Sequence, residues 1–226
     1  MSLSPKQRRQ LIGSLRIYNR NTKKISFFSM NDAQSELLDL LETYNRVLVL
    51  KARRFGISTL IRSYQFVNAM DATEPHTYAV MAHTRKASEE VNKMDGRFYD
   101  NLPRSIKPKL LKRNTSTITF DKSKATIEVF TAGGKGGTRA FEAYMAHLSE
   151  FAFYGDQEEI LTTVLPTVGT GQIVIESTPD CTGDKFHELV LGAMREDGKR
   201  EPGPNGWVLV FFPWFEHPEY QITPGP

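Results

Sequence analysis

The sequence has a single cysteine, Cys181, and it lacks any run of about 18 apolar residues. One thiol excludes a disulfide scaffold and a cysteine-rich zinc site, and it is typical of a reducing compartment. No membrane-spanning helix is expected, and the polar, basic beginning of the chain does not fit a signal peptide. With 226 residues, of which 39% are hydrophobic, the chain is long enough to bury one core. Disordered and collagen-like classes are therefore excluded.

Acidic residues are absent from residues 1–31, which hold seven Lys or Arg. We expect residues 1–30 to form a basic N-terminal segment that either contacts a partner or stays disordered. Residues 31–212 are expected to form one folded domain. The proline-rich stretch 213–226 is expected to be a linker. The overall net charge of +3 therefore conceals an uneven distribution along the chain.

Apolar runs alternate with amphipathic stretches, which predicts an α/β fold with a mainly parallel central sheet flanked by helices. Two alternating, β-rich runs, Thr115–Phe120 and Ala125–Thr131, predict a β-hairpin insertion, and glycines at 133–137 predict a loop after it. Strands are expected at 47–50, 78–82, 143–148, 173–176 and 207–212. Helices are expected at 31–44, 58–70, 85–100, 158–164 and 185–195.

The most informative segment joins the first apolar strand to the next helix through Lys51–Gly56, and the helix opens at Ser58 and Thr59. Backbone N–H groups and a helix N-terminus then converge on one point, which suits a phosphate. In the standard pattern G-x-x-x-x-G-K-[ST], Gly56 and Ser58 stand in place, but Lys51 replaces the first glycine and Ile57 the lysine. Lys51 could reach across the loop instead. The alternative is an ordinary strand–turn–helix with a basic surface.

Two later strands end in residues that could complete such a site. The run 143–148 leads to Ser149 and Glu150, and an ATPase needs a carboxylate at such a strand end to orient the attacking water. The run beginning at Gln172 leads to Ser177 and Thr178, whose hydroxyls could sense a γ-phosphate. Each strand end could equally be a solvated terminus with no further role.

Taken in order, these motifs resemble the large terminase subunits of tailed bacteriophages over roughly residues 25–220. Those proteins are ASCE-type P-loop ATPases that drive double-stranded DNA into a procapsid. Some of them carry the loop lysine at the start of the loop. Their acidic strand typically ends in Asp-Glu, so Ser149 departs from the pattern because it brings no charge.

The resemblance implies roles for particular residues. Lys51 and Glu150 would be catalytic, with Glu150 as general base or water-orienting residue. Mg²⁺ would be held by Ser58, and by Ser149 through a water. Ser177 and Thr178 would couple phosphate loss to movement. ATP would be bound by Gln34, Lys51, Ala52, Arg53, Arg54, Phe55, Gly56, Ile57, Ser58 and Thr59.

Two of the implied roles have rivals. Gln34 resembles the family's adenine-reading glutamine, but it follows Asn31 by three residues and could instead close a helix capping box. Arg139 is the expected arginine finger, reaching the nucleotide of a neighbouring subunit. Arg53 or Arg54 acting within the same subunit is the competing choice.

Binding of DNA without sequence preference needs positive surface. A helix and the hairpin around residues 104–124, together with the loop at Lys135, are the candidates, and a merely solvated basic face is the alternative. The candidate contacts are Arg104, Lys107, Lys109, Lys112, Arg113, Lys122, Lys124 and Lys135.

The resemblance also implies partners. Besides ATP, Mg²⁺ and double-stranded DNA, these are the portal protein, the small terminase subunit and further copies in a ring on the procapsid, with the isolated chain monomeric. The place of action would be the host cytoplasm, at the portal. The chain is too short to include the nuclease domain of a full large terminase, so no nuclease activity is expected. The alternatives are another P-loop DNA translocase or helicase, or a weakly hydrolysing nucleotide-binding DNA tether.

Overall fold

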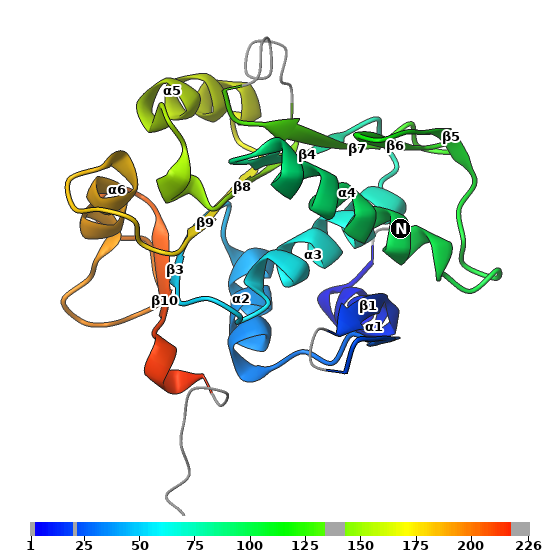
Figure 1. Ribbon diagram of the computed structural model, residues 1–226, viewed down its shortest axis with the longest axis horizontal. Helices are drawn as coiled ribbons and strands as arrows, with labels where there is room; N and C mark the ends of the chain where they lie inside the picture. Colours follow the sequence, from blue (N-terminus) through cyan, green and yellow to red (C-terminus); the bar gives the residue numbers. More distant parts are fainter. Residues whose placement is uncertain (1–2, 20–21, 134–142, 218–226) are drawn as a thin grey trace, which may run out of the picture.

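The computed structural model describes residues 3–19, 22–133 and 143–217. An eight-stranded sheet runs through the centre in the order β10-β3-β9-β8-β4-β7-β6-β5 (Figure 1). Its strands are β3 (Arg46–Lys51), β4 (Thr77–Ala82), β5 (Leu110–Arg113), β6 (Thr117–Phe120), β7 (Thr126–Thr131), β8 (Met145–Ser149), β9 (Gln172–Ser177) and β10 (Val208–Phe212). All neighbouring pairs from β10 to β7 are parallel. The predicted α/β fold is confirmed.

Helices cover both faces of the sheet (Figure 1). On one face lie α2 (Asp32–Thr43), α3 (Ile57–Asp71) and α4 (Arg85–Asp100), and on the other lie α5 (Gln157–Val168) and α6 (Lys185–Ala193). Strand β3 shows why both faces need covering. Val47 and Val49 belong to the core beneath α2, α3 and α4, and Leu48 belongs to the core beneath α5 and α6. Strands of a parallel sheet that are buried on both faces are apolar throughout. None of the helices in the described part of the chain is long and apolar enough to cross a membrane.

The predicted hairpin is present as β6 and β7, but it extends the central sheet, because β7 pairs in parallel with β4. A third strand, β5, pairs with β6 and forms the far edge. The helix expected before the hairpin within the basic stretch 104–124 is absent from the described structure, which there forms turns and then β5. Lys112 and Arg113 on β5 fit an edge strand, where charged side chains discourage pairing with another chain.

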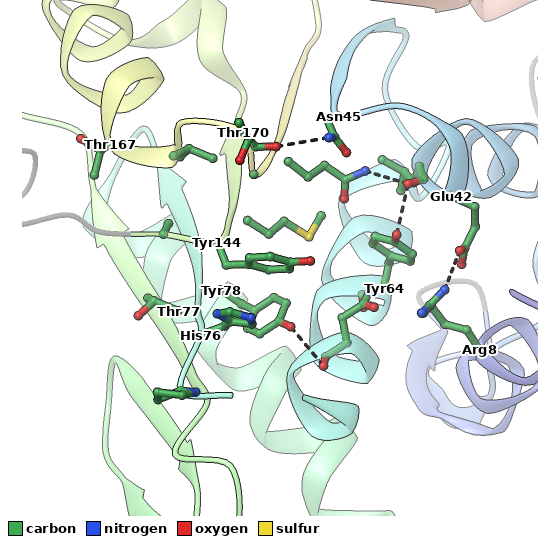
Figure 2. Close-up of a pocket in the computed structure, with 18 residues that line it drawn as sticks. Arg8, Glu42, Asn45, Tyr64, His76, Thr77, Tyr78, Tyr144, Thr167 and Thr170 are labelled. Atoms are coloured by element: carbon green, nitrogen blue, oxygen red, sulfur yellow. Dashed lines mark hydrogen bonds and ion pairs between the residues drawn. The ribbon is translucent and has the colours of Figure 1, made fainter. Parts of the chain in front are cut away.

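A cavity of about 710 Å³ lies at the amino-terminal ends of the central strands (Figure 2). Its lining includes Asn45, Thr77 and Gln172, at the beginnings of β3, β4 and β9. On its wall the ring of His76 stacks on Tyr144, with centroids 4.1 Å apart. Ligands of open α/β sheets bind outside the opposite, carboxyl ends of the strands. This cavity is therefore separate from the expected nucleotide site.

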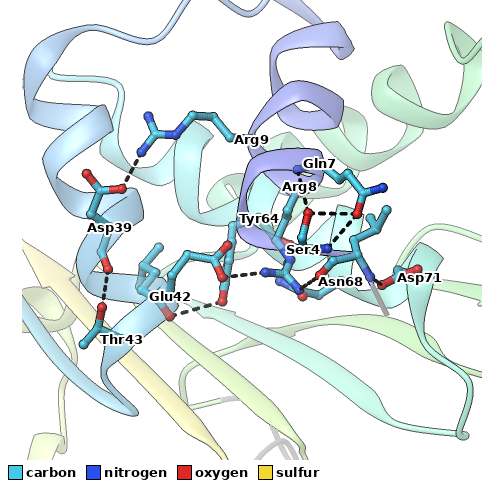
Figure 3. A network of polar contacts seen from close by, with 12 residues as sticks. Ser4, Gln7, Arg8, Arg9, Asp39, Glu42, Thr43, Tyr64, Asn68 and Asp71 are labelled. Carbon is cyan, nitrogen blue, oxygen red and sulfur yellow. Dashed lines mark hydrogen bonds and ion pairs between the residues drawn. The ribbon is translucent and has the colours of Figure 1, made fainter. Parts of the chain in front are cut away.

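The basic N-terminal segment contains a helix, α1 (Pro5–Ser14), and an antiparallel pair, β1 (Arg16–Asn19) and β2 (Lys24–Phe27). Helix α1 buries Ile12 in the main core. Arg8 and Arg9 form ion pairs with Glu42 and Asp39 of α2, each with an N–O distance of 2.5 Å (Figure 3). Part of the positive charge of this segment is therefore used to hold α1 on the domain. A short 3₁₀ turn, η2 (Trp214–Glu216), follows β10 and lies within the expected linker 213–226, whose role as a linker remains a prediction.

A candidate nucleotide site at the carboxyl ends of the central strands

Strand alternation brings the polar residues of three strands to one face of the sheet. In the parallel register Val49 lies beside Glu176, and Glu176 lies beside Ser149. Since residues two apart on a strand share a face, Lys51 points to the same side as Glu176 and Ser149. This is the side covered by α3, whose first turn carries Ser58. Lys51, Ser58, Ser149 and Glu176 therefore converge at the carboxyl ends of β3, β8 and β9.

Lys51 lies between two carboxylates. Its Nζ is 2.8 Å from Oε1 of Glu150 and 3.0 Å from Oε2 of Glu176, and only 6% of its side chain is exposed. Burial disfavours the ammonium form, but the attraction of Glu176 and Glu150 outweighs burial and raises the pKa of Lys51. Lys51 therefore provides a fixed positive charge at the beginning of the loop, next to the expected catalytic acid.

Glu176 is fully buried and receives hydrogen bonds from two hydroxyls. Ser58 Oγ donates to its Oε1 over 2.7 Å, and Ser149 Oγ donates to the same oxygen over 2.8 Å. His147 Nε2 lies 3.3 Å from that oxygen. Burial alone raises the pKa of a carboxyl group, but Lys51, His147 and Ser58 reverse this effect and hold the pKa of Glu176 below its usual value. Glu176 is thus a buried carboxylate at the centre of the cluster.

Glu150 occupies a left-handed backbone conformation, with φ of 57° and ψ of 49°. Residues other than glycine rarely adopt this conformation, and such residues cluster at functional sites. Its Oε2 accepts hydrogen bonds from the backbone N–H of Thr178 over 3.2 Å and from the Thr178 hydroxyl over 3.3 Å, and Ser177 Oγ lies 3.5 Å away. The expected catalytic acid therefore touches both expected coupling residues directly.

The loop between β3 and α3 is anchored at both of its ends. Ala52 N–H donates to the carbonyl of Phe212 on β10 over 2.9 Å, and the ring of Phe55 stacks on Phe212. Ile57 is 1% exposed and belongs to the main core. The position where a standard phosphate loop has its lysine is thus used for packing, which leaves Lys51 as the lysine of this loop.

Gln34 forms the capping box of α2 with Asn31 and also contacts the loop. Asn31 N–H donates to Oε1 of Gln34 over 3.0 Å, and Gln34 Nε2 donates to the carbonyl of Gly56 over 2.9 Å. Gly56 has φ of 71°, and a Cβ there would lie 2.5 Å from Gln34 Nε2, so a larger residue would be strained and would displace the Gln34 amide. The capping alternative is therefore present, and adenine recognition by Gln34 remains a prediction.

The remaining loop residues and the expected finger are placed as follows. Arg53 and Arg54 are exposed on the loop, and Arg54 has a left-handed φ of 72°. Thr59 is half-buried in the first turn of α3. Arg139 and Lys135 lie outside the described residues, so their expected roles remain predictions.

Several basic residues expected to contact DNA form ion pairs within the chain. Arg113 makes a two-pronged contact with Asp100, at 2.5 and 2.8 Å. Lys109 and Lys124 lie 3.4 and 3.1 Å from the carboxylate of Asp121. Lys107 donates to the carbonyl of Asp100 over 3.2 Å. Four candidates have no ion pair to any described residue, namely Arg104, Lys107, Lys112 and Lys122.

The oxygens of the cluster fit Mg²⁺. Magnesium prefers hard oxygen ligands and is commonly held by one or two carboxylates together with substrate phosphates. The hydroxyls of Ser58 and Ser149 meet the carboxylate of Glu176, and the carboxylate of Glu150 lies on the other side of Lys51. Within residues 3–19, 22–133 and 143–217, no group of three or more His, Cys, Asp or Glu could hold a metal ion. A metal ion at this cluster would therefore also depend on nucleotide phosphates.

Two residues of the cluster were missed by sequence reasoning, Glu176 and His147. Both stand in strands that are otherwise apolar, and Glu176 shares a face with the buried Val174. A carboxylate on the buried face of a central strand is costly unless it is paired, so its presence was a signal of a functional cluster.

Comparison of the sequence with protein-family models and with curated proteins gave no match. Solved structures do match. The large terminase ATPase domain of Thermus phage P74-26 is 16% identical, with a TM-score of 0.68 over 94% of this chain and 86% of that one. The large terminase of bacteriophage HK97 is 14% identical, with a TM-score of 0.68 over 95% of this chain and 44% of that one.

A third match is the ADP complex of a large terminase from a thermophilic bacteriophage. It is 12% identical, with a TM-score of 0.56 over 80% of this chain and 45% of that one. The chain thus spans less than half of the HK97 protein and less than half of this third protein. The resemblance predicted from the sequence is confirmed at the level of the fold, which is that of the ATPase domains of large terminases.

Proposed function

We propose that this chain is the ATPase domain of a phage large terminase, which couples ATP hydrolysis to the movement of double-stranded DNA into a procapsid. One observation carries the proposal: Lys51, at the start of the loop, lies 2.8 Å from Glu150 at the end of β8. A cation for phosphates and an acid for water are thus side by side at the carboxyl edge of the sheet, where an ATPase needs them.

In this proposal each group has a distinct task. The backbone of the loop and Lys51 bind the triphosphate, so Lys51 exchanges a carboxylate partner for phosphate oxygens. Glu150 accepts hydrogen bonds from the attacking water and orients it. Ser177 and Thr178, which already contact Glu150, transmit the change to the rest of the domain. Ser58, and Ser149 through a water, would hold a Mg²⁺ ion bound with the nucleotide, which would supply positive charge against the phosphates.

The DNA-contacting surface is proposed to centre on Lys112 and Lys122 and to include Arg104. Because phosphate contact is electrostatic, it gives affinity without sequence preference. Arg139 of a neighbouring copy is proposed as the finger that completes the site. A ring of copies on the procapsid in the host cytoplasm, the portal protein and the small terminase subunit are the proposed setting.

A second candidate function is a nucleotide-binding DNA tether that hydrolyses slowly. It is favoured by Ser149, which brings a hydroxyl where a charge would strengthen metal binding, and by Lys51, which is engaged with two carboxylates.

Phosphate release by the wild-type chain tests the proposal. The assay uses ATP at high protein concentration, with and without Mg²⁺ and with and without linear duplex DNA. We expect release that requires Mg²⁺ and increases with DNA. Binding of ATP without release would favour the tether, and neither binding nor release would contradict both candidate functions.

A further inference from the structure

Glu176 is the best-connected side chain of the candidate site, although none of the implied roles includes it. One of its oxygens, Oε1, accepts hydrogen bonds from Ser58 and Ser149 at 2.7 and 2.8 Å, while Oε2 lies 3.0 Å from Lys51. The carboxylate is fully buried. Glu176 therefore cannot meet a nucleotide by its own surface, and it acts through the groups that it holds.

The hydrogen bond from Ser58 has a direct chemical consequence. A serine hydroxyl has one hydrogen to donate and two lone pairs to offer. With the hydrogen committed to Glu176, the lone pairs of Ser58 remain available for a cation. Ser58 is half-buried in the first turn of α3, at the end of the phosphate loop. Its hydroxyl is thus oriented by Glu176 before any nucleotide arrives.

The distribution of negative charge in the cluster also points to Glu176. Ser149, beside Glu176 on the neighbouring strand, is neutral and uses its hydrogen on the same oxygen. Glu150 lies on the other side of Lys51, with 28% of its side chain exposed. The only carboxylate bonded to both hydroxyls among the described residues is therefore Glu176.

We propose that Glu176 is the outer carboxylate of the Mg²⁺ site, holding the hydroxyls of Ser58 and Ser149 toward the ion and supplying the negative charge that Ser149 lacks. This inference rests on the proposed nucleotide-binding function. It makes Glu176 a positioning residue that acts through Ser58. Outer partners of this kind typically change metal affinity by about 10–100-fold when they are replaced.

The competing role for Glu176 is that of a simple counter-ion for Lys51. The two roles differ in what they do to nucleotide binding. A counter-ion affects binding equally with and without metal, because it acts on Lys51. An outer carboxylate affects the additional affinity that Mg²⁺ provides, and it leaves metal-free binding nearly unchanged.

Equilibrium titration with a fluorescent ATP analogue, in EDTA and over a range of Mg²⁺ concentrations, separates the two roles. We expect Glu176→Gln to bind the analogue in EDTA within about threefold of wild type and to need at least about tenfold more Mg²⁺ for half of the metal effect. Ser58→Ala should show the same shift, and Ser58→Ala combined with Glu176→Gln should add little to it. The exposed Glu74→Gln is the matched control and should behave like wild type.

A rescue variant makes the test independent of the stability of Glu176→Gln. Ser149 and Glu176 are neighbours in register, so Ser149→Asp combined with Glu176→Gln returns one carboxylate to the cluster. We expect the double variant to recover a half-saturating Mg²⁺ concentration within about threefold of wild type. Thermal melting identifies any variant that is unfolded at the assay temperature.

Two results would overturn the inference. One is a Glu176→Gln chain with the wild-type Mg²⁺ requirement. The other is a folded double variant that needs at least about tenfold more Mg²⁺ than wild type. Both leave nucleotide binding itself intact. A wild-type chain that binds no analogue at any Mg²⁺ concentration would instead contradict the proposed function on which the inference depends.

Discussion

Glu150→Gln is expected to lower the rate of phosphate release by about 10²–10⁴-fold while ATP affinity stays equal or becomes tighter. The amide keeps the shape of the carboxylate, but it cannot take a proton from water as a base. Affinity is retained because Lys51 and the loop backbone stay in place, and one negative charge near the triphosphate is removed. Single-turnover phosphate release and equilibrium ATP titration measure the two quantities separately.

Glu159→Gln is a suitable control, because it makes the same substitution on the exposed surface of α5. We expect its hydrolysis rate to match the wild type. A Glu150→Gln chain that releases phosphate at the wild-type rate, at the same high protein concentration, would remove Glu150 from the catalytic role.

Asp95→Asn is expected to destabilise the fold by about 3–5 kcal/mol. Asp95 on α4 and Arg62 on α3 form an ion pair of 2.5 Å in which both side chains are fully buried. Arg62 also donates to Gln65, whose amide donates to the carbonyl of Ala79 on β4 over 3.0 Å. Neutralising the acid leaves an uncompensated guanidinium in the core. Denaturant unfolding measures the free energy directly.

Two controls show whether burial of the pair is the cause. Asp100, on the same helix as Asp95, forms an exposed pair with Arg113 of β5, and we expect Asp100→Asn to cost about 1 kcal/mol or less. Arg62→Met combined with Asp95→Leu replaces both charges by apolar groups, and we expect it to be much more stable than Asp95→Asn. Equal losses for Asp95→Asn and Asp100→Asn would contradict this account of the α3–α4 contact.

The central strands could be predicted because a strand buried on both faces appears in the sequence as an uninterrupted apolar run. Val47–Leu50 and Ile173–Ile175 are apolar throughout, and both lie within strands of the observed sheet. The order of the strands in the sheet cannot be predicted from such apolar runs. Lys51 meets Glu176 because β9 lies between β3 and β8, and this depends on contacts between residues far apart in the chain.

The elements that were missed are short and polar. Strand β5 has the sequence Leu-Leu-Lys-Arg and is largely exposed at the sheet edge, so it shows no alternation of apolar residues. Helix α1 is also polar and has one fully buried residue, so it shows no apolar stripe. The capping box of Ser4 and Gln7 could nevertheless have indicated its start. The pairing of Arg113 with Asp100 depends on the path of the turn before β5, which local sequence does not specify.

Equilibrium binding of ATP to the wild-type chain and to Lys51→Met tests the central claim most directly, which is that the loop beginning at Lys51 is the nucleotide site. Loss of a charge-assisted contact to phosphate costs about 1.5–3 kcal/mol, so we expect the affinity of the folded Lys51→Met chain to fall by about 10–100-fold. A folded Lys51→Met chain that binds ATP as tightly as the wild type would contradict the account.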